Sequence, residues 1–187
     1  MQRSRGKILW LILLLIAAVM LFFAAYRGYY KAAYPLGFAG TVMEHSALHE
    51  LPPGLVFAVI WTESGFRPNV VSSADARGLM QITEDTFEWV QLRYGKDGDV
   101  YEDLFDPGRN IEYGTALLRL LLDEYGTERN ALAAYHAGWG SARSWLASPE
   151  YSPDGVNITH IPFLDTNYYV HRVLQTWEIY RRLYNID

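Results

Sequence analysis

The hydrophobic pattern begins with an unbroken apolar run near the N-terminus. All 18 residues of 8–25 are apolar, which is just enough to cross a bilayer as a helix. Three basic side chains and no acid precede the run, so the positive-inside rule places the N-terminus in the cytoplasm and the rest of the chain outside. A cleaved signal peptide is the alternative, but its apolar core is usually only about 7–15 residues long, and residues 22–26 make a poor cleavage site. The pattern therefore predicts an uncleaved, single-pass anchor in the cell membrane over residues 1–25.

Beyond the anchor, apolar residues recur at helical spacing, and no segment shows sustained strand alternation beside a hairpin turn. Residues 26–40, with Pro35 and Gly37 opposing regular helix, are predicted to form a linker, and residues 147–162 a loop. Capping residues, prolines and glycines mark the helix ends. The predicted helices cover residues 42–50, 52–65, 107–125, 128–137, 141–146 and 167–184, and a further helix begins after Thr83. The pattern predicts one mainly α-helical domain over residues 41–187.

Composition narrows the functional classes. The chain has no Cys, which excludes a disulfide framework, a Cys-ligated zinc or iron–sulfur site, a thiol nucleophile and the lipid-acceptor Cys of a bacterial lipoprotein. The formal net charge is −5, but the chain after residue 25 holds 13 basic against 21 acidic groups, or −8. A nucleic-acid-binding domain has the opposite sign. We therefore expect no nucleic-acid partner, and attachment to a membrane depends on the apolar helix itself.

Two histidines suggest a metal site at first sight. His45 and His49 lie four residues apart on a predicted helix, where they could face one ion. The zinc-protease arrangement needs Glu directly after the first His, and Ser46 occupies that position. We interpret the pair as two solvated histidines, and the sequence predicts no metal and no organic cofactor.

Glu63 is an acid in an unexpected place. Counting in steps of three and four along its predicted helix puts it on the apolar face. Burial beside Trp61 and Phe66, and a position near the negative end of the helix dipole, both favour its protonated form. A carboxylic acid that stays protonated near neutral pH is what a general acid needs to break a glycosidic bond. The alternative is a structural Glu paired with Arg67, and buried acids are more often structural than catalytic.

Five blocks of sequence include and follow this glutamate. They are 63–68 (ESGFRP), 72–82 (SSADARGLMQI), 106–111 (DPGRNI), 133–140 (AAYHAGWG) and 165–173 (DTNYYVHRV). In order and spacing they resemble the soluble lytic transglycosylase domain, a relative of goose-type lysozyme that cleaves bacterial peptidoglycan. The resemblance covers roughly residues 41–184. An anchor followed by a compact domain is similar to the small membrane-bound forms of this family found in bacteria with a thick wall.

The resemblance implies a lysozyme-like helical domain with a groove for a glycan strand, and Glu63 as the single catalytic acid/base. The acid would protonate the oxygen between N-acetylmuramic acid and N-acetylglucosamine. It would then take the proton of the muramic C6 hydroxyl, which attacks C1 and closes a 1,6-anhydro ring. The substrate's acetamido group can stabilise C1, so the second carboxylate of ordinary glycosidases is not needed. Asp75, Glu84 and Asp85 are the alternative second carboxylates, and they lie in segments predicted to be exposed.

The resemblance also implies substrate-binding roles on both sides of the 72–82 block. Ser64 and Ser73 match hydroxyls near the cleavage site, and Gly78 would allow the backbone to approach a sugar closely. Met80 and Gln81 match a pair that lines the groove. The thioether of Met80 would lie against a sugar face, and the amide of Gln81 would form a hydrogen bond with the sugar. Ordinary structural roles remain open: a turn or cap for Ser73, a turn glycine for Gly78 and core packing for Met80.

Three aromatic residues complete the implied site. Tyr135 matches the tyrosine whose hydroxyl orients the catalytic Glu, and Tyr169 matches a second tyrosine near the reacting sugar, although tyrosines on helices are more often packing residues. His136 stands where the family usually has Asn. Because imidazole can become charged, we expect altered sugar contact or pH dependence if His136 faces the groove, and little change if it caps the helix.

The sequence therefore predicts a peptidoglycan lytic transglycosylase whose partners are glycan strands and, through the N-terminal helix, the membrane. It names no partner in the cell-wall machinery. A hydrolytic lysozyme is the alternative enzyme, which would release reducing ends instead of 1,6-anhydro ends. A catalytically silent glycan-binding factor for wall assembly is the alternative from another class, and such a factor would not need Glu63.

Overall fold

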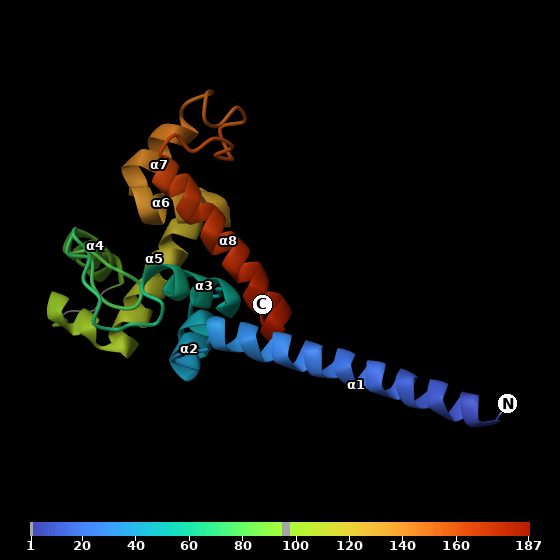
Figure 1. The fold of residues 1–187 in the computed structure, drawn as a ribbon. Helices are drawn as coiled ribbons and strands as arrows, with labels where there is room; N and C mark the ends of the chain where they lie inside the picture. Colours follow the sequence, from blue (N-terminus) through green and yellow to red (C-terminus); the bar gives the residue numbers. More distant parts are fainter. Residues whose placement is uncertain (1, 95–97) are drawn as a thin grey trace. The chain divides into compact units, whose positions relative to one another are not determined.

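The computed structural model describes residues 2–94 and 98–187. Within these ranges the regular structure is helical, and β-type pairing is limited to isolated bridges that join residue 77 to residues 71 and 82. The mainly α-helical class is thus confirmed. The helices are α1 (Gln2–Ala33), α2 (Ala39–Leu48), α3 (Pro53–Glu63), α4 (Glu84–Tyr94), the 3₁₀ helix η1 (Tyr101–Phe105), α5 (Pro107–Tyr125), α6 (Glu128–Ala137), α7 (Trp139–Leu146) and α8 (Leu164–Tyr184) (Figure 1).

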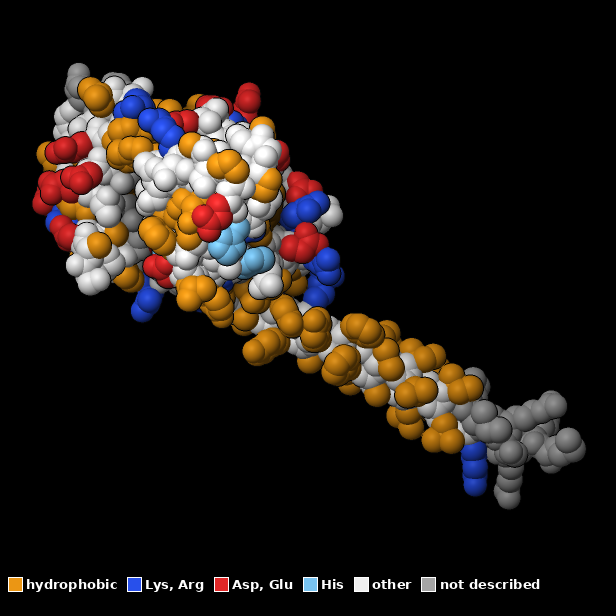
Figure 2. All heavy atoms as spheres, turned by 90° about the horizontal axis from the view of Figure 1, so that it is seen from above, with side chains coloured by type: hydrophobic (Ala, Val, Ile, Leu, Met, Phe, Trp, Pro, Cys, Tyr) orange, Lys and Arg blue, Asp and Glu red, His pale blue; other side chains and the backbone are white. Residues whose placement is uncertain are grey.

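The chain divides into two compact units between Pro35 and Leu36, and α1 makes up nearly all of the first. In the described chain, Trp10–Ala33 is the one helix long and apolar enough to cross a membrane. Its large apolar side chains are exposed and form the orange rod in Figure 2. The helix also covers residues 26–33, where the sequence predicts a linker without regular helix. The reason is that no proline occurs before Pro35, and extending an existing helix is far easier than starting one.

α3 is the central buried element of the second unit. Pro53 occupies its first turn, where a missing N–H costs nothing, and every residue from Gly54 to Ile60 is buried. The helix packs against α2 and, more extensively, against α8, which runs past it in Figure 1. Gly54 permits this close approach, because a Cβ there would lie 3.0 Å from the Trp177 ring. A helix that is apolar on all sides suits a position surrounded by protein.

The capping signals locate two of the helices. Asp106 caps α5 by accepting a hydrogen bond from the N–H of Arg109 at 2.9 Å, and Gly126 ends that helix in the left-handed conformation with φ of 78°. Thr127 caps α6 in the same way, and Gly138 ends it. The bounds of α5 and α6 therefore agree with those predicted.

Other boundaries differ from the prediction by two or three residues. α2 begins at residue 39, α7 at 139 and α8 at 164. The early start of α8 brings Asp165 into its first turn, where the helix dipole favours a negative charge. α4 begins directly after Thr83 as predicted, and the Thr83 hydroxyl donates to the Thr86 hydroxyl at 2.9 Å. The loop over residues 147–162 is also confirmed.

Candidate active site

Glu63 is the last residue of α3, and its carboxyl group lines a pocket of about 400 Å³. α3, α6 and α8 supply the walls of this pocket. The lining residues are Thr62, Glu63, His136, Asp165, Tyr168, Tyr169 and Arg172. Residues far apart in the sequence meet here because α8 packs against both α3 and α6.

Burial sets the protonation state of Glu63. Desolvation raises the pKa of this carboxyl from 4.5 to about 7, and the nearby Tyr169 hydroxyl lowers it only in part. Arg67, the alternative partner, donates its Nε–H to the Ser64 carbonyl at 2.8 Å instead. Glu63 is therefore a carboxyl group that carries a proton through mildly acidic conditions and can give it up near neutrality.

Tyr169 is the tyrosine whose hydroxyl acts directly on the Glu63 carboxyl. Its side chain is only 7% exposed, and burial together with the neighbouring Glu63 charge holds its own pKa well above 10, so the phenol stays protonated. The Tyr169 hydroxyl approaches the carboxyl closely enough to lower its pKa, yet it has no partner at full hydrogen-bond geometry among the described residues. The Thr62 hydroxyl, also buried, likewise has no such partner. Two buried hydroxyls beside Glu63 thus have hydrogen-bonding capacity that no described residue fills at full geometry.

The Tyr135 hydroxyl lies near Glu63 and makes its hydrogen bond to a backbone carbonyl. It donates to the Met80 carbonyl at 2.6 Å rather than to Glu63, although the Glu63 charge is near enough to raise the pKa of the phenol further above its ordinary value. The Tyr135 ring stacks nearly parallel to that of Tyr169, with ring centroids 6.5 Å apart. Tyr135 therefore connects α6 to the backbone of Met80 through a hydrogen bond, and its ring packs against the ring of Tyr169.

Two of the residues expected to contact substrate, Ser64 and Met80, are buried in the structure. Ser64 is 1% exposed, and its hydroxyl donates to the Ile60 and Leu79 carbonyls, the latter at 2.8 Å. Met80 is fully buried, and its sulfur packs so closely on Gly114 that a Cβ added there would lie only 2.2 Å from it. Neither side chain lines the Glu63 pocket.

Gly78 is likewise a packing glycine. With φ of +77° it adopts a conformation that other residues rarely take, and a Cβ there would collide with the Asn110 side chain and the Leu104 carbonyl. The backbone of Gly78 therefore lies close to the Asn110 side chain. Asn110 is a fully buried residue to which the sequence assigned no role. Its amide accepts from the Met80 N–H at 2.7 Å and donates to the carbonyls of Arg77 and Leu104, both at 2.9 Å.

Gln81 and Ser73 lie outside the Glu63 pocket. Gln81 has φ of +49°, and its side-chain amide donates to the carbonyls of Val70 and Gly78 at 3.0 and 2.9 Å, which closes the turn. Ser73 is exposed in the same segment. Residues 70–82, which we call the supporting turn, are therefore held chiefly by their own hydrogen bonds and by Asn110.

His136 faces the pocket. Its Nδ1 lies 3.0 Å from the Thr166 hydroxyl, and its ring packs against Tyr169 with centroids 4.5 Å apart. Burial lowers the pKa of the imidazole, and the Asp165 charge opposes this only in part. His136 is therefore neutral at neutral pH and bridges α6 to the first turn of α8.

Several residues that line the pocket were not predicted from the sequence. Asp165, Tyr168 and Arg172 reach the pocket from α8, where all three are exposed and carry no signal beyond helical spacing. Asp75, Glu84 and Asp85 are exposed as predicted, and none of them lines the pocket.

His49 is buried instead of solvated, which corrects the prediction. Desolvation lowers the pKa of its imidazole, and its Nε2 lies 3.2 Å from the Tyr94 hydroxyl. The cause is the packing of α2 onto its neighbours, which turns His49 inward. No cluster of three potential metal ligands occurs among the residues that the structure describes.

The fold and the pocket together define a lysozyme-like helical domain with one partly buried glutamate at its centre. Residues 41–155 match the family described as "Transglycosylase SLT domain", and the chain belongs to this family. The soluble lytic murein transglycosylase of Escherichia coli K12 is 32% identical over 151 residues, which cover 79% of this chain and 23% of that protein. The membrane-bound lytic murein transglycosylase C of Sodalis glossinidius is 31% identical over 170 residues, which cover 78% of this chain and 47% of that one.

Solved structures give the same family. The lytic transglycosylase Slt of Pseudomonas aeruginosa, in an inactive glutamate-to-glutamine mutant, matches with a TM-score of 0.72 and 30% identity over 81% of this chain and 25% of that one. The 70 kDa soluble lytic transglycosylase of E. coli matches with a TM-score of 0.73 and 29% identity over 82% and 25%. The chain thus spans about a quarter of the length of these soluble relatives.

Proposed function

We propose that this protein is a peptidoglycan lytic transglycosylase that cleaves the β-1,4 bond between N-acetylmuramic acid and N-acetylglucosamine. The observation that carries the proposal is Glu63, a single carboxyl group with a pKa of about 7 at the end of a buried helix, open to a pocket. The names of the relatives support the reaction class. The P. aeruginosa relative is inactive when one glutamate becomes glutamine, which agrees with a reaction that depends on a titratable carboxyl.

Glu63 acts twice in the proposed mechanism. Its protonated carboxyl first gives its proton to the bridging oxygen, and the C1–O bond breaks as the acetamido oxygen of the muramic residue stabilises C1. The resulting carboxylate then takes the proton of the C6 hydroxyl, whose oxygen bonds to C1 and closes the 1,6-anhydro ring. Glu63 ends the cycle protonated. A pKa near 7 suits both steps, because the group must donate and accept at a similar pH.

The neighbouring groups have positioning roles in this proposal. The hydroxyls of Thr62 and Tyr169, which have no partner at full hydrogen-bond geometry within residues 2–94 and 98–187, are assigned to sugar groups beside the carboxyl. Tyr135, Ser64 and Asn110 hold the supporting turn against α3 and α5 and thereby fix the wall on which Glu63 sits. Ser73, Gly78, Met80 and Gln81 contribute through this turn rather than through pocket contact.

We infer that α1 anchors the protein in the cell membrane, with the N-terminus in the cytoplasm and the second unit outside. A helix of 24 residues with exposed apolar side chains supports this inference, as does the membrane-bound name of one group of relatives. The anchor and linker then comprise residues 1–40, with the helix continuing to Ala33, and residues 41–187 form the catalytic domain.

Hydrolysis is the second candidate reaction, because Asp165 lines the same pocket as Glu63. A second carboxylate could activate a water molecule, as in inverting glycosidases. Mass spectrometry of digested peptidoglycan separates the two reactions. We expect 1,6-anhydromuramyl ends, and exclusively reducing ends would overturn the transglycosylase proposal.

Replacing Glu63 by Gln tests the acid/base role and excludes the silent binding factor. The substitution keeps the shape of the side chain and removes its proton. We expect turnover of purified peptidoglycan to fall by about 10² or more. An exposed Glu150→Gln variant, which removes one acid far along the sequence from the site, should retain wild-type turnover. Undiminished turnover in the Glu63 variant would contradict the mechanism.

A further inference from the structure

The outer face of α2 is apolar although it is exposed. Five residues of this helix are exposed, and only Glu44 among them is charged. The five are Gly40, Met43, Glu44, Ala47 and Leu48. Met43 and Leu48 are 46% and 62% exposed. The other side of α2, with the buried Val42 and Ser46, packs against α3 and α5. A surface helix normally carries polar residues opposite its packed side, so the outer face of α2 lacks the usual adaptation to water.

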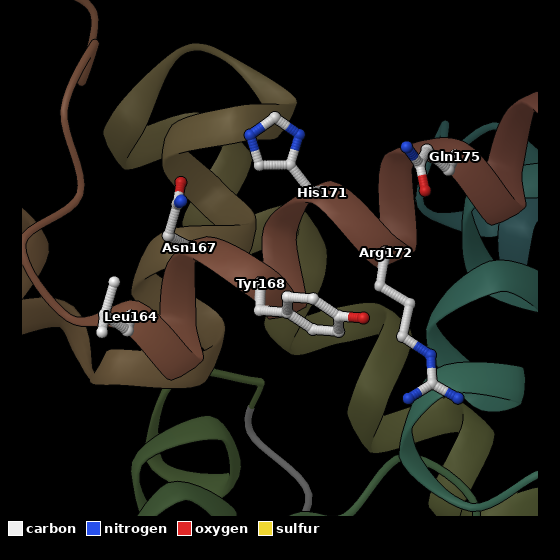
Figure 3. Close-up of a pocket in the computed structure, with 6 residues that line it drawn as sticks. All are labelled: Leu164, Asn167, Tyr168, His171, Arg172 and Gln175. Carbon is white, nitrogen blue, oxygen red and sulfur yellow. The ribbon is translucent and has the colours of Figure 1, made fainter.

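Two other surfaces of the second unit differ from this face. α4 is similar in length to α2, and four of its five exposed residues are charged. The five are Glu84, Asp85, Glu88, Leu92 and Arg93. Leu164 at the start of α8 is 85% exposed, but it shares a shallow hollow with the polar side chains of Asn167, His171 and Gln175 (Figure 3). The outer face of α2 is distinguished from both surfaces by its near absence of polar groups.

α2 follows the membrane-spanning segment almost directly. Trp10–Ala33 has 24 residues and is about 36 Å long at about 1.5 Å per residue, whereas the hydrocarbon layer of a bilayer is about 30 Å thick. Tyr26 and Tyr29, which are exposed near the end of this segment, belong to a residue type enriched at membrane surfaces. Residues 34–38 then lead to α2 and can extend by about 20 Å at most. The length of the chain therefore keeps the start of α2 close to the lipid headgroups.

We propose that the outer face of α2 is a lipid-contact surface, with Met43, Ala47 and Leu48 in the headgroup region of the membrane that holds α1. The inference rests on the proposed function in one respect, the membrane anchor, and not on the reaction. Lipid is the favoured occupant because the same chain leaves the bilayer only a few residues earlier. The exposed positions of α2 include one acid, Glu44, and no base, so apolar burial stabilises the contact and anionic lipid is not required.

Such a contact orients the catalytic domain. A single membrane helix leaves the attached domain free to turn above the bilayer, and a second contact fixes the face that the domain presents to it. α3 begins four residues after α2 ends, and Glu63 is its last residue. The contact would therefore hold the Glu63 pocket at a constant height above the membrane, within reach of glycan strands that lie close to the bilayer.

Fluorescent labels at single positions test the contact. The chain has no Cys, so Leu48→Cys, Met20→Cys and Leu164→Cys each give the full chain one labelling site. The labelled proteins are reconstituted in phosphatidylcholine vesicles with and without spin-labelled lipid. We expect the spin label to reduce emission about twofold or more at residue 48, and also at residue 20 in α1, because an interfacial helix lies about 5–10 Å into the headgroup and acyl boundary. Emission at residue 164, an exposed position at the opposite end of the second unit from α2 (Figure 1), should not change.

The three positions separate the possible outcomes. Quenching at residue 20 without quenching at residue 48 would overturn the lipid contact and leave the anchor supported. Energy transfer between donor and acceptor labels at residue 48 on different copies, in place of quenching, would identify a second copy of the chain as the occupant. Equal quenching at residues 48 and 164 would mean that no particular face of the second unit meets the membrane. Absence of quenching at residue 20 would contradict the anchor and the lipid contact together.

Removing the apolar side chains supplies a matched variant. With the label at Ala47→Cys, adding Met43→Gln and Leu48→Gln should abolish most of the quenching. Adding Leu92→Gln, which removes an exposed apolar side chain from α4, should leave the quenching unchanged. Cleavage of a soluble glycan by the wild-type chain is measured separately. Lipid contact without cleavage would contradict the proposed reaction and leave the contact supported, and cleavage without lipid contact would do the opposite.

Discussion

Two neighbouring regions of this domain share the residues expected at the site, but they use them in opposite ways. The Glu63 pocket has a carboxyl group whose pKa is raised by desolvation, and beside it lie two hydroxyls without a partner of full hydrogen-bond geometry in the described part of the chain. The supporting turn, which begins seven residues later, contributes no lining residue to the pocket, and its polar groups bond within the turn or to the buried side chains of Asn110, Tyr135 and Ser64. Family motifs therefore contain two kinds of residue. Some are available for chemistry, and others, such as Gly78 and Met80, keep the first kind in place.

The largest expected effect on folding comes from the supporting turn. Asn110→Ala removes one acceptor and two donor contacts, and so leaves the Met80 N–H and the Arg77 and Leu104 carbonyls without their partner. Buried backbone groups left unpaired are costly, so we expect the free energy of unfolding to fall by about 3 kcal/mol. Urea denaturation of the full chain in detergent, followed by tryptophan fluorescence, measures this loss.

A matched control separates this effect from loss of an amide in general. Gln175→Ala removes an amide from an exposed position on α8, and its stability should stay within about 0.5 kcal/mol of the wild type. Equal stability of the two variants would mean that Asn110 does not hold the turn.

The pocket should behave in the opposite way, because Glu63 opposes folding at high pH. Its pKa is about 7 in the folded protein, above the ordinary value of 4.5, so the folded state binds the proton more tightly. Stability from this group is therefore complete below about pH 4.5 and is lost as the pH rises to about 7. At pH 8, Glu63→Gln should be more stable than the wild type by about 2–3 kcal/mol, and at pH 4 the difference should vanish.

Denaturation of both proteins across this pH range tests the sign. Glu150→Gln, at an exposed position, should show no such pH-dependent gain. A Glu63→Gln variant that is less stable than the wild type at pH 8 would identify Glu63 as a structural carboxylate and would reverse the contrast between the two regions.

Local rules predict much of this fold. Asp106, Gly126, Thr127 and Gly138 determine where α5 and α6 begin and end, because caps act on the adjacent turn. The placement of Glu63 on an apolar face follows in the same way from the spacing of its own helix. The 66–83 segment has few such signals, since its conformation depends on hydrogen bonds to Asn110 and on positive φ angles.

The partners of side chains are less predictable because they depend on distant packing. The Tyr135 hydroxyl bonds to a carbonyl 55 residues earlier in the chain, and no periodicity reveals which of the two nearby acceptors it selects. Tyr168 and Arg172 show the same limit. They lie about 100 residues after Glu63 on a face that resembles ordinary solvated helix, and only the packing of α8 on α3 brings them to the pocket.

Tyr169 and Tyr135 allow the Glu63 pocket and the supporting turn to be compared by removing one hydroxyl from each. Tyr169 lowers the pKa of Glu63, so Tyr169→Phe should raise that pKa. The decrease of kcat/KM at high pH, which we call the falling limb and which follows loss of the Glu63 proton, should then move to higher pH, with a loss of activity of a few-fold. Tyr135→Phe instead removes the bond to the Met80 carbonyl and should lower stability while leaving the limb in place. Profiles of kcat/KM against pH, measured on one soluble glycan substrate, distinguish the two. Identical shifts in both variants would mean that the hydroxyls act through a common structural change.

The smallest effect is expected where the chain departs from its family, at His136. Burial lowers the pKa of this imidazole below its ordinary value, whereas burial raises the pKa of Glu63 to about 7, so His136 loses its proton at lower pH than Glu63 does. Its contact with the Thr166 hydroxyl at 3.0 Å needs only one donor or one acceptor, and an amide supplies either. His136→Asn should therefore change kcat/KM less than threefold at pH 6–8, as for loss or replacement of one neutral hydrogen bond. A larger change confined to pH values below about 6.5, the ordinary pKa of histidine, would mean that His136 becomes charged in the working enzyme and that the pocket is wetter than the packing of Tyr169 against it implies.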